Sequence, residues 1–163
     1  VPLLYPGHFK AWRPVWPQKD LKKPNAVKRN HITNKWLFPN GYYCIVRRFS
    51  SKEEKRRIVA SVVEPEDFDG EEMLGFENHL NVYHINKHGL TKELAYGLAV
   101  YLNSTAVDEH FRIFNGHTQV NATDLRLIKY PDKEKLIDLG KQFLKSQNFD
   151  QRGIDKYLRN LIS

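Results

Sequence analysis

Residues 89–131 read GLTKELAYGLAVYLNSTAVDEHFRIFNGHTQVNATDLRLIKYP, and the order of segments within this stretch decides the fold. Apolar residues recur at helical spacing over residues 92–103, which predicts a helix. Residues 106–114 form a second helical run, and the pair 115–116, Asn-Gly, ends it in the usual C-terminal manner. Residues 124–130 are largely apolar and predict a short strand. The stretch therefore predicts two helices, a polar turn and a strand.

Side chains at the ends of these segments support the prediction. Thr91 is a suitable N-cap for the first helix, and Ser104 or Thr105 for the second. Asp108 lies in the first turn of the second helix, where an acidic side chain favours the helix dipole. We expect Gly116 to supply a positive φ in the polar turn that follows.

The residues upstream predict strands. Residues 42–49 and 56–63 are rich in β-branched and aromatic side chains, as strands are. The charged residues 50–55 lie between them, so a hairpin is the simplest interpretation. Residues 64–75 are acidic and contain two glycines, which predicts a loop. Residues 77–85 alternate between polar and apolar, which predicts a third strand.

Two further amphipathic runs, residues 133–146 and 150–162, predict helices. Strands and helices do not alternate regularly, so we expect an α+β fold with a small mixed or antiparallel sheet as its core and helices packed on it. We place an irregular, basic, Pro- and aromatic-rich segment at residues 1–41, packed on the core. The core follows at residues 42–131, with a C-terminal helical appendage at residues 132–163.

Charge is distributed unevenly along the 163 residues. Residues 1–60 contain 14 Lys or Arg and 3 Asp or Glu, whereas residues 61–163 contain 12 and 16, so the net charges are +11 and −4. A basic segment of this kind is typical of a polyanion partner, although charge for solubility is the alternative. One cysteine, Cys44, cannot form an internal disulfide, which fits a reducing cytoplasm. No apolar run is long enough to span a bilayer, so we expect no membrane partner.

Patterns for catalysis are scarce. The sequence has no Gly-rich phosphate loop and no Gly-x-Ser-x-Gly elbow. Residues 53–55, Glu-Glu-Lys, resemble the end of a metal-dependent nuclease signature, but the only upstream acid is Asp20. His79, His84 and His88 are close in sequence, yet their spacing on a strand does not favour a shared metal. A solvated hairpin tip and polar strand ends are the alternatives that we favour.

Nucleic-acid binding is better supported. Arg suits bidentate contact to guanine, Lys suits phosphate, and Gln can read adenine. Neighbouring strand residues point to opposite faces, so about half of the hairpin cations can face one DNA surface, and the others form ion pairs or lie in solvent. Residues 117–119 either read bases or satisfy the backbone of their turn. The candidate DNA-binding residues are Lys22, Lys23, Lys28, Arg29, Lys35, Arg47, Arg48, Lys52, Lys55, Arg56, Arg57, His79, Asn81, His117 and Gln119.

The three tryptophans, Trp12, Trp16 and Trp36, all lie in the Pro-rich N-terminal segment. Exposed indole rings stack on bases in proteins that bind single strands. Aromatic residues in irregular segments more often anchor the segment onto a domain. We favour the anchoring role.

Several segments together resemble a known family. They are LLYP (residues 3–6), GYYCIVRRF (41–49), NHLN (78–81), LNS (102–104) and the run from Gly116 that contains Leu-x-x-Ile-x-x-Pro (125–131). Their order and spacing resemble the C-terminal target-recognition domain of TaqI-like adenine-specific DNA methyltransferases of restriction-modification systems. Specificity subunits of Type I systems share part of the pattern.

The resemblance implies that this chain recognises a sequence in double-stranded DNA and does no chemistry itself. A catalytic domain of the same parent chain would carry the Asn-Pro-Pro-Tyr/Phe motif and bind S-adenosylmethionine, and the target adenine would be flipped into it. The Asn-Pro-Pro-Tyr/Phe motif and the family's Gly-rich motif for S-adenosylmethionine are both absent here, and the first residue is not Met, so we expect a fragment without a cofactor of its own. A metal-dependent nuclease and a protein-interaction module without a DNA role are the alternatives.

Overall fold

The computed structural model describes residues 1–146 and 150–162. The strands are β1 (Leu3–Leu4), β2 (Phe9–Lys10), β3 (Arg13–Pro14), β4 (Leu37–Pro39), β5 (Tyr43–Arg47), β6 (Ala60–Val63), β7 (Met73–Phe76) and β8 (Leu80–Tyr83). The helices are α1 (Lys92–Leu102), α2 (Thr105–Phe114), α3 (Ala122–Arg126), α4 (Lys133–Ser146) and α5 (Gln151–Ile162). Short 3₁₀ turns are η1 (Pro6–His8), η2 (Thr33–Trp36) and η3 (Pro65–Phe68). The predicted α+β class is confirmed.

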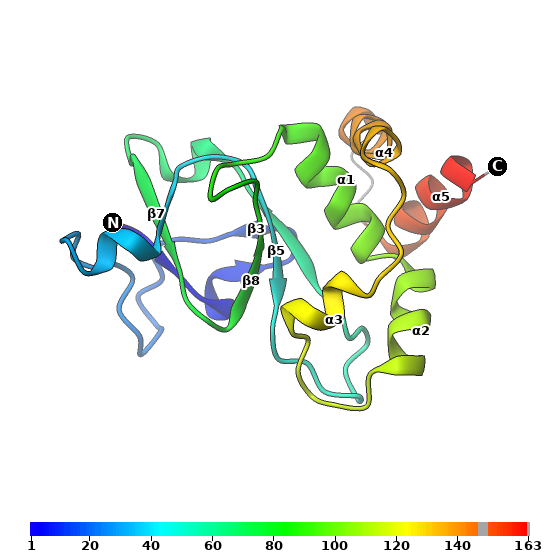
Figure 1. The fold of residues 1–163 in the computed structure, drawn as a ribbon, viewed down its shortest axis with the longest axis horizontal. Helices are drawn as coiled ribbons and strands as arrows, with labels where there is room; N and C mark the ends of the chain where they lie inside the picture. Colours follow the sequence, from blue (N-terminus) through cyan, green and yellow to red (C-terminus); the bar gives the residue numbers. More distant parts are fainter. Residues whose placement is uncertain (147–149, 163) are drawn as a thin grey trace.

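The strands form a central sheet and a second sheet that packs against it (Figure 1). The central sheet is antiparallel with the order β6-β5-β8, as the predicted hairpin and third strand require. The second sheet has the order β1-β7-β4, in which β1 runs parallel to β7, and β2 and β3 form a small hairpin. Helix α1 covers the other face of the central sheet, with α4 packed on α1. The molecule is therefore layered as sheet, sheet and helices.

Strand β5 is buried on both faces, which explains why its sequence is apolar throughout. Tyr43 and Ile45 face the second sheet, whereas Cys44 and Val46 face the helices. Period-two alternation holds here, but both sets of side chains are in a core. Cys44 is a buried core residue, and burial raises the pKa of its thiol.

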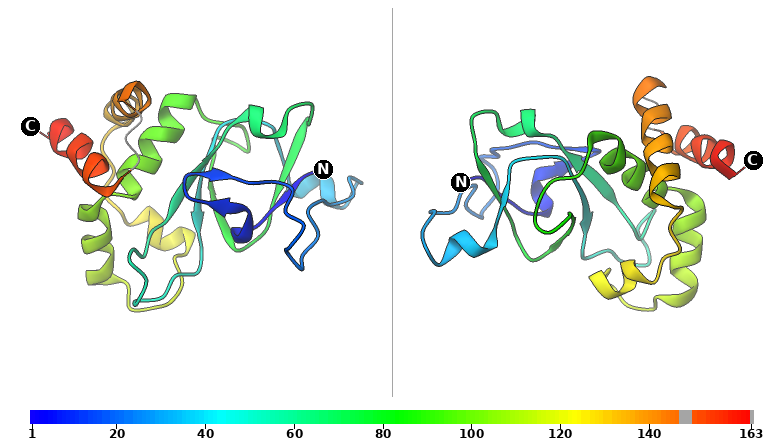
Figure 2. Two further views of the ribbon diagram at one scale, coloured as in Figure 1. Left: turned by 180° about the vertical axis from the view of Figure 1, so that it is seen from behind. Right: turned by 45° about the horizontal axis from the view of Figure 1, so that its top comes forward.

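The N-terminal segment is more ordered than its prolines predict. Its strands β1 and β4 flank β7, so the prediction that residues 64–75 form only a loop is wrong at their end. Trp12 stacks on Phe143 of α4, with ring centroids 4.9 Å apart, and Trp16 packs against Phe68. Seen from behind, the segment lies across the sheets, away from α5 (Figure 2). Two tryptophans thus anchor the segment, while Trp36 is 56% exposed.

The two predicted N-caps are present. Thr91 accepts from the Leu94 amide and begins α1, and Ser104 accepts from the Val107 amide and begins α2. Asn103, between the helices, turns inward. Its side chain donates to the Ala60 carbonyl (2.9 Å) and accepts from the Ala60 amide (2.8 Å), which ties the end of α1 to β6. The Leu-Asn-Ser pattern therefore joins two helices and a strand.

Two local predictions are wrong. Residues 124–130 do not form a strand, because Asp124 accepts from the Asn121 amide (2.9 Å) and caps the short helix α3. Gly116 does not have a positive φ; Gly70 is the one glycine of the described residues that does. Asp108 lies in the first turn of α2, as predicted, and it also makes contacts that the sequence did not indicate. It is buried, and it accepts from the Arg57 amide (2.7 Å) and from Arg112 Nε (2.9 Å).

Arg57 is the most bulky of the fully buried side chains, at 1% exposure. Its Nε donates to Ser50 Oγ (3.1 Å), and its Nη2 donates to Asn115 Oδ1 (3.3 Å) and to the His117 carbonyl. The guanidinium also lies over the ring of Phe111, 5.4 Å from its centroid. Burial, with the neighbouring Arg112, lowers the pKa of Arg57. One cation thus joins the β5–β6 connection to α2 and to the turn that follows it.

Helices α1 and α4 approach so closely that two glycines are required. A Cβ added at Gly140 would lie 1.8 Å from the Glu93 carbonyl oxygen, and one added at Gly97 would lie 1.8 Å from the Leu136 carbonyl oxygen. Both obstacles are backbone atoms, which cannot rotate away. The contact therefore depends on the absence of both side chains.

We predict that Gly140→Ala destabilises the protein by about 1–3 kcal/mol, because the helices must move apart. Alanine in an exposed helix interior would instead stabilise it by about 0.5–1 kcal/mol. Urea unfolding monitored by circular dichroism measures the change. Gly116→Ala is the matched control, since no atom lies within 4 Å of its added Cβ. Equal stability of Gly140→Ala and the parent chain would contradict the close packing.

We predict that Arg57→Met lowers the free energy of unfolding by about 2–4 kcal/mol, because the acceptors on Ser50, Asn115 and His117 lose their donor. Amide hydrogen exchange should accelerate across residues 115–119. Lys55→Met removes an exposed cation from the same connection and should change stability by less than about 0.5 kcal/mol. Similar effects of the two substitutions would show that the buried guanidinium does not hold this region.

Candidate nucleic-acid interface

Three segments that are distant in sequence meet beyond the end of β5. The Arg48 amide donates to the His79 carbonyl (2.9 Å), and the Val120 amide donates to the Arg48 carbonyl (2.6 Å). The Ser50 amide then donates to the Thr118 carbonyl (2.9 Å). Backbone bonds on both sides therefore hold residues 48–50 between the turn before β8 and the segment before α3.

Side chains strengthen this junction. Arg48 Nε donates to Asn121 Oδ1 (3.1 Å), and its Nη1 lies 3.5 Å from the Asn78 carbonyl oxygen. Asn81 Nδ2 donates to the Val120 carbonyl (2.8 Å). The predicted site residues Arg48 and Asn81 thus lie together. The amide nitrogen of Asn81 holds the loop backbone, so Asn81 is a positioning residue in this arrangement.

Phe49 lies at the centre of this junction with 42% of its surface exposed. Its ring centroid is 5.1 Å from that of His79, and the Arg48 guanidinium lies 5.9 Å from it. Phe49 and His79 also line a shallow hollow of about 420 Å³ with Lys22 and Lys23. We call these five residues, Lys22, Lys23, Arg48, Phe49 and His79, the Phe49 face.

The loop that carries the two lysines is fixed from inside by a polar network. The Tyr5 amide donates to Nδ1 of buried His8 (3.2 Å), so His8 Nε2 carries the proton and donates to Asn25 Oδ1 (2.6 Å). Trp16 Nε1 donates to the Asn25 carbonyl (2.7 Å), and the Tyr5 hydroxyl donates to the Lys23 carbonyl (2.7 Å). The charged ends of the lysines are exposed while their backbone is held.

An acidic side chain lies beside the Phe49 face. Glu77 Oε1 is 2.5 Å from His79 Nδ1 and 3.8 Å from Lys23 Nζ. Its side chain is 21% exposed, whereas that of Lys23 is 53% exposed. The carboxylate therefore links the turn before β8 to the basic loop, and Lys23 still presents its charge to solvent.

Other predicted cations lie elsewhere. Arg29 pairs with Glu72 (3.3 Å) and donates to Asn34 (3.2 Å), which places it beside η2. Lys28 and Lys35 are exposed near the same turn. The partner of Arg29 therefore lies in the acidic segment of residues 64–75.

Arg47 of β5 and the cations of the β5–β6 connection bind other partners or lie in solvent. Arg47 pairs with Glu54, and Arg56 Nη1 donates to the Asn103 carbonyl (2.5 Å) at the end of α1. Lys52 and Lys55 are exposed, and the Lys52 carbonyl accepts from Arg112 of α2. Arg57 is buried, so it is removed from the candidate DNA-binding set.

The polar turn at residues 115–119 has the structural role that was one of the two alternatives for it, because its own side chain Asn115 satisfies its backbone. The His117 amide donates to Asn115 Oδ1 (2.9 Å), and Asn115 Nδ2 donates to the Gln119 carbonyl (3.2 Å). The side chain of His117 is exposed, and that of Gln119, which lies opposite Phe49 in a bridge, is partly exposed. The backbone is therefore satisfied internally while polar side chains remain accessible.

Phe49 and Asn121 were missed in the sequence. In the sequence, Phe49 is the last residue of the predicted apolar strand 42–49. In the structure, β5 ends at Arg47, so Phe49 lies beyond the strand and is exposed. Asn121 stands before a helix that was taken for a strand. A signal for Asn121 was present in the capping pair Asn121 and Asp124, three residues apart. No local signal marks Phe49.

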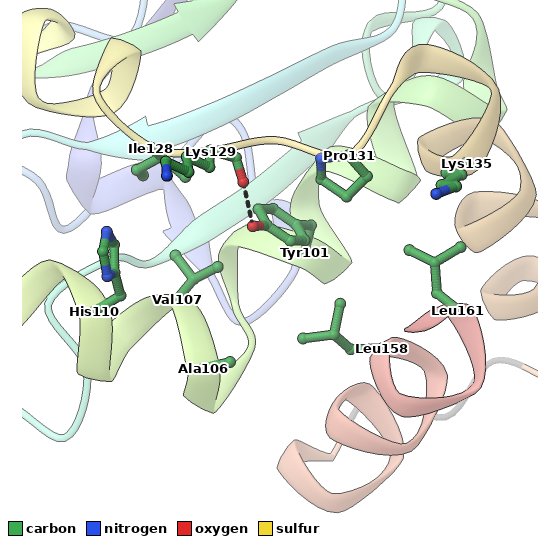
Figure 3. A pocket seen from close by; sticks show the side chains of 10 residues that line it. All are labelled: Tyr101, Ala106, Val107, His110, Ile128, Lys129, Pro131, Lys135, Leu158 and Leu161. Atoms are coloured by element: carbon green, nitrogen blue, oxygen red, sulfur yellow. Dashed lines mark hydrogen bonds between the residues drawn. The ribbon is translucent and has the colours of Figure 1, made fainter. Parts of the chain in front are cut away.

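A second concavity lies among the helices (Figure 3). Its volume is about 480 Å³, and its lining is mainly apolar, with the Tyr101 hydroxyl donating to the Lys129 carbonyl (2.6 Å). No carboxylate lines it in the described chain, although carboxylates typically bind the ribose hydroxyls of nucleotide cofactors. This lining does not fit S-adenosylmethionine.

The residues described by the structure contain no group of three His, Cys, Asp or Glu placed to hold a metal ion. His84 instead accepts from the Lys87 amide (2.9 Å), and burial with the nearby Lys87 lowers its pKa. Within the same described ranges, no helix is long and apolar enough to cross a bilayer.

Comparison with known proteins adds two relatives. The chain is 57% identical over 163 residues to the type II methyltransferase M.BsuBI of Bacillus subtilis and 48% identical over 162 residues to the type II methyltransferase M.PstI of Providencia stuartii. Each alignment covers 99% of this chain but 32% of the relative, so the chain spans about a third of their length. No family model and no solved structure matches. The chain is homologous to a portion of type II methyltransferases.

Proposed function

We propose that this chain is the double-stranded DNA recognition module of an adenine-N6 DNA methyltransferase. The observation that carries the proposal is the Phe49 face, where distant segments join by backbone hydrogen bonds and present cations, an aromatic ring and polar side chains. Phosphate contacts position a protein on DNA, and base contacts specify the sequence. A rigid surface that offers both kinds of group suits this task.

The roles follow from the position of each side chain. Lys22 and Lys23 are exposed on a fixed loop and are suited to phosphate. Arg48, His79, His117 and Gln119 surround the junction, and their donors and acceptors suit base edges. Lys28, Arg29, Lys35, Lys52 and Lys55 are assigned to outer phosphate contacts. Arg47 and Arg56 are engaged within the protein and contribute mainly to the electrostatic field.

The catalytic part is proposed to lie in the rest of the parent chain. The relatives are about three times as long as this chain and are named type II methyltransferases. S-adenosylmethionine would supply the methyl group when bound there. This chain would hold the duplex so that the target adenine reaches the neighbouring domain of the same parent. The residues described here bind and orient.

We predict that duplex DNA binding weakens as salt rises, and that Lys22→Ala with Lys23→Ala reduces the slope of log K against log salt by about 1–2. The double variant Lys141→Ala with Lys145→Ala removes equal charge from exposed positions on α4 and should leave the slope close to that of the parent chain. Fluorescence anisotropy with a randomised duplex pool measures both.

Three results would contradict this proposal. Equal slopes for the two double variants would show that the Phe49 face is not the contact surface. Absence of salt-dependent retention of any duplex would instead favour a module that binds an acidic protein. Cleavage of the pool by the chain on addition of Mg²⁺ would favour the nuclease alternative.

A further inference from the structure

We infer that Phe49 stacks on a base of the bound duplex as an apolar wedge between neighbouring base pairs. The inference rests on the proposed DNA-recognition function and names one contact within it. Single exposed apolar residues are common on protein surfaces, so the exposure of Phe49 alone is no evidence for a binding role. The surroundings of the ring distinguish Phe49 from the other exposed apolar residues.

The first distinguishing observation is rigidity. The amides and carbonyls on both sides of Phe49 are bonded to His79, Val120 and Thr118, and Phe49 itself forms a bridge with Gln119. Its backbone has little freedom left to lose on binding. A phenyl group has only two side-chain torsions, so its ordering costs little free energy. Such a ring is suited to act as an anchor.

The second observation is the chemistry around the ring. His79 lies tilted by 49° at one side, Arg48 lies near the ring, and Lys22 and Lys23 share the adjoining hollow. An apolar partner protein would leave these charges desolvated, which costs free energy. A duplex instead supplies phosphates for the cations and a flat π-face for the ring. Charge complementarity therefore favours a polyanion, and the exposed ring favours a nucleic acid over an acidic protein.

The third observation is what the ring lacks. Phe49 has no polar atom, so it cannot read a base edge by hydrogen bonding. Its contribution is stacking, which tolerates any base but favours steps that unstack easily, such as pyrimidine–purine steps. Phe49 would therefore contribute affinity and indirect readout, while His79, Gln119 and Arg48 beside it supply the polar contacts.

The other exposed apolar side chains provide a control. Ile113 of α2 is 84% exposed, and it lines a different hollow with Arg112 and Gly116. Substitution of Ile113 removes exposed apolar surface of similar kind without touching the Phe49 face. Ile113→Ala is therefore the matched control for Phe49→Ala.

The test uses a duplex enriched from a randomised pool by the unmodified chain, with 2-aminopurine placed at successive positions. We expect 2-aminopurine at one step to brighten on binding, because stacking by Phe49 separates it from its neighbour. Phe49→Ala should abolish this signal and weaken binding about tenfold. The salt slope should not change, since no phosphate contact is lost. Phe49→Trp should restore the signal, and Ile113→Ala should keep it.

The outcomes separate the two proposals. If the unmodified chain enriches a duplex but Phe49→Ala binds it equally well, the wedge is wrong and DNA recognition stands. A loss of affinity without any change in 2-aminopurine fluorescence also overturns stacking, because Phe49 then contacts something other than a base. If no duplex is retained by the unmodified chain, DNA recognition fails and the wedge fails with it. Circular dichroism of Phe49→Ala checks that the fold is intact.

Discussion

The buried guanidinium of Arg57 is the interaction on which the arrangement of the candidate site depends. Burial of a charge costs free energy that hydrogen bonds offset, and Arg57 donates from Nε and Nη2 to Ser50, Asn115 and the His117 carbonyl, while its buried Nη1 has no hydrogen-bond partner among the described residues. Asp108 adds a bond to the Arg57 backbone and pairs with Arg112. The β5–β6 connection, α2 and the polar turn are therefore held as one unit.

The Phe49 face is built on that unit. The turn after α2 continues into residues 118–120, whose backbone forms hydrogen bonds with Arg48 and Ser50. The segment before α3 also accepts hydrogen bonds from the side chains of Arg48 and Asn81. On the other side, the network around Asn25 fixes the loop of Lys22 and Lys23. A surface made rigid before binding loses less entropy when it binds, which favours affinity and specificity together. The buried polar networks thus hold the Phe49 face in one conformation.

The elements that were predicted correctly from the sequence are those that depend on interactions between residues close together in the chain. Thr91 and Ser104 cap their helices with bonds to residues three positions away, and apolar spacing marked the faces of α1 and α4. The strand β7 was missed because its partners, β1 and β4, come from residues 1–41. Helix α3 was missed because apolar residues in a short run do not separate helix from strand. The polar turn was located correctly, but its glycine was given a conformation that it does not adopt.

Sequence by itself determined the α+β class, most helix boundaries and the concentration of positive charge in residues 1–60, because these depend on composition and on near neighbours. Tertiary structure decided which of those cations meet solvent. Arg48 and Arg57 are chemically identical and nine positions apart, yet one borders an exposed ring and the other is buried. The position of each side chain depends on hydrogen-bond partners that are distant in sequence. The partners of Arg48 are 30 and 73 residues away, and one partner of Arg57 is 60 residues away. No local pattern specifies such pairings, because they arise only when distant segments pack together.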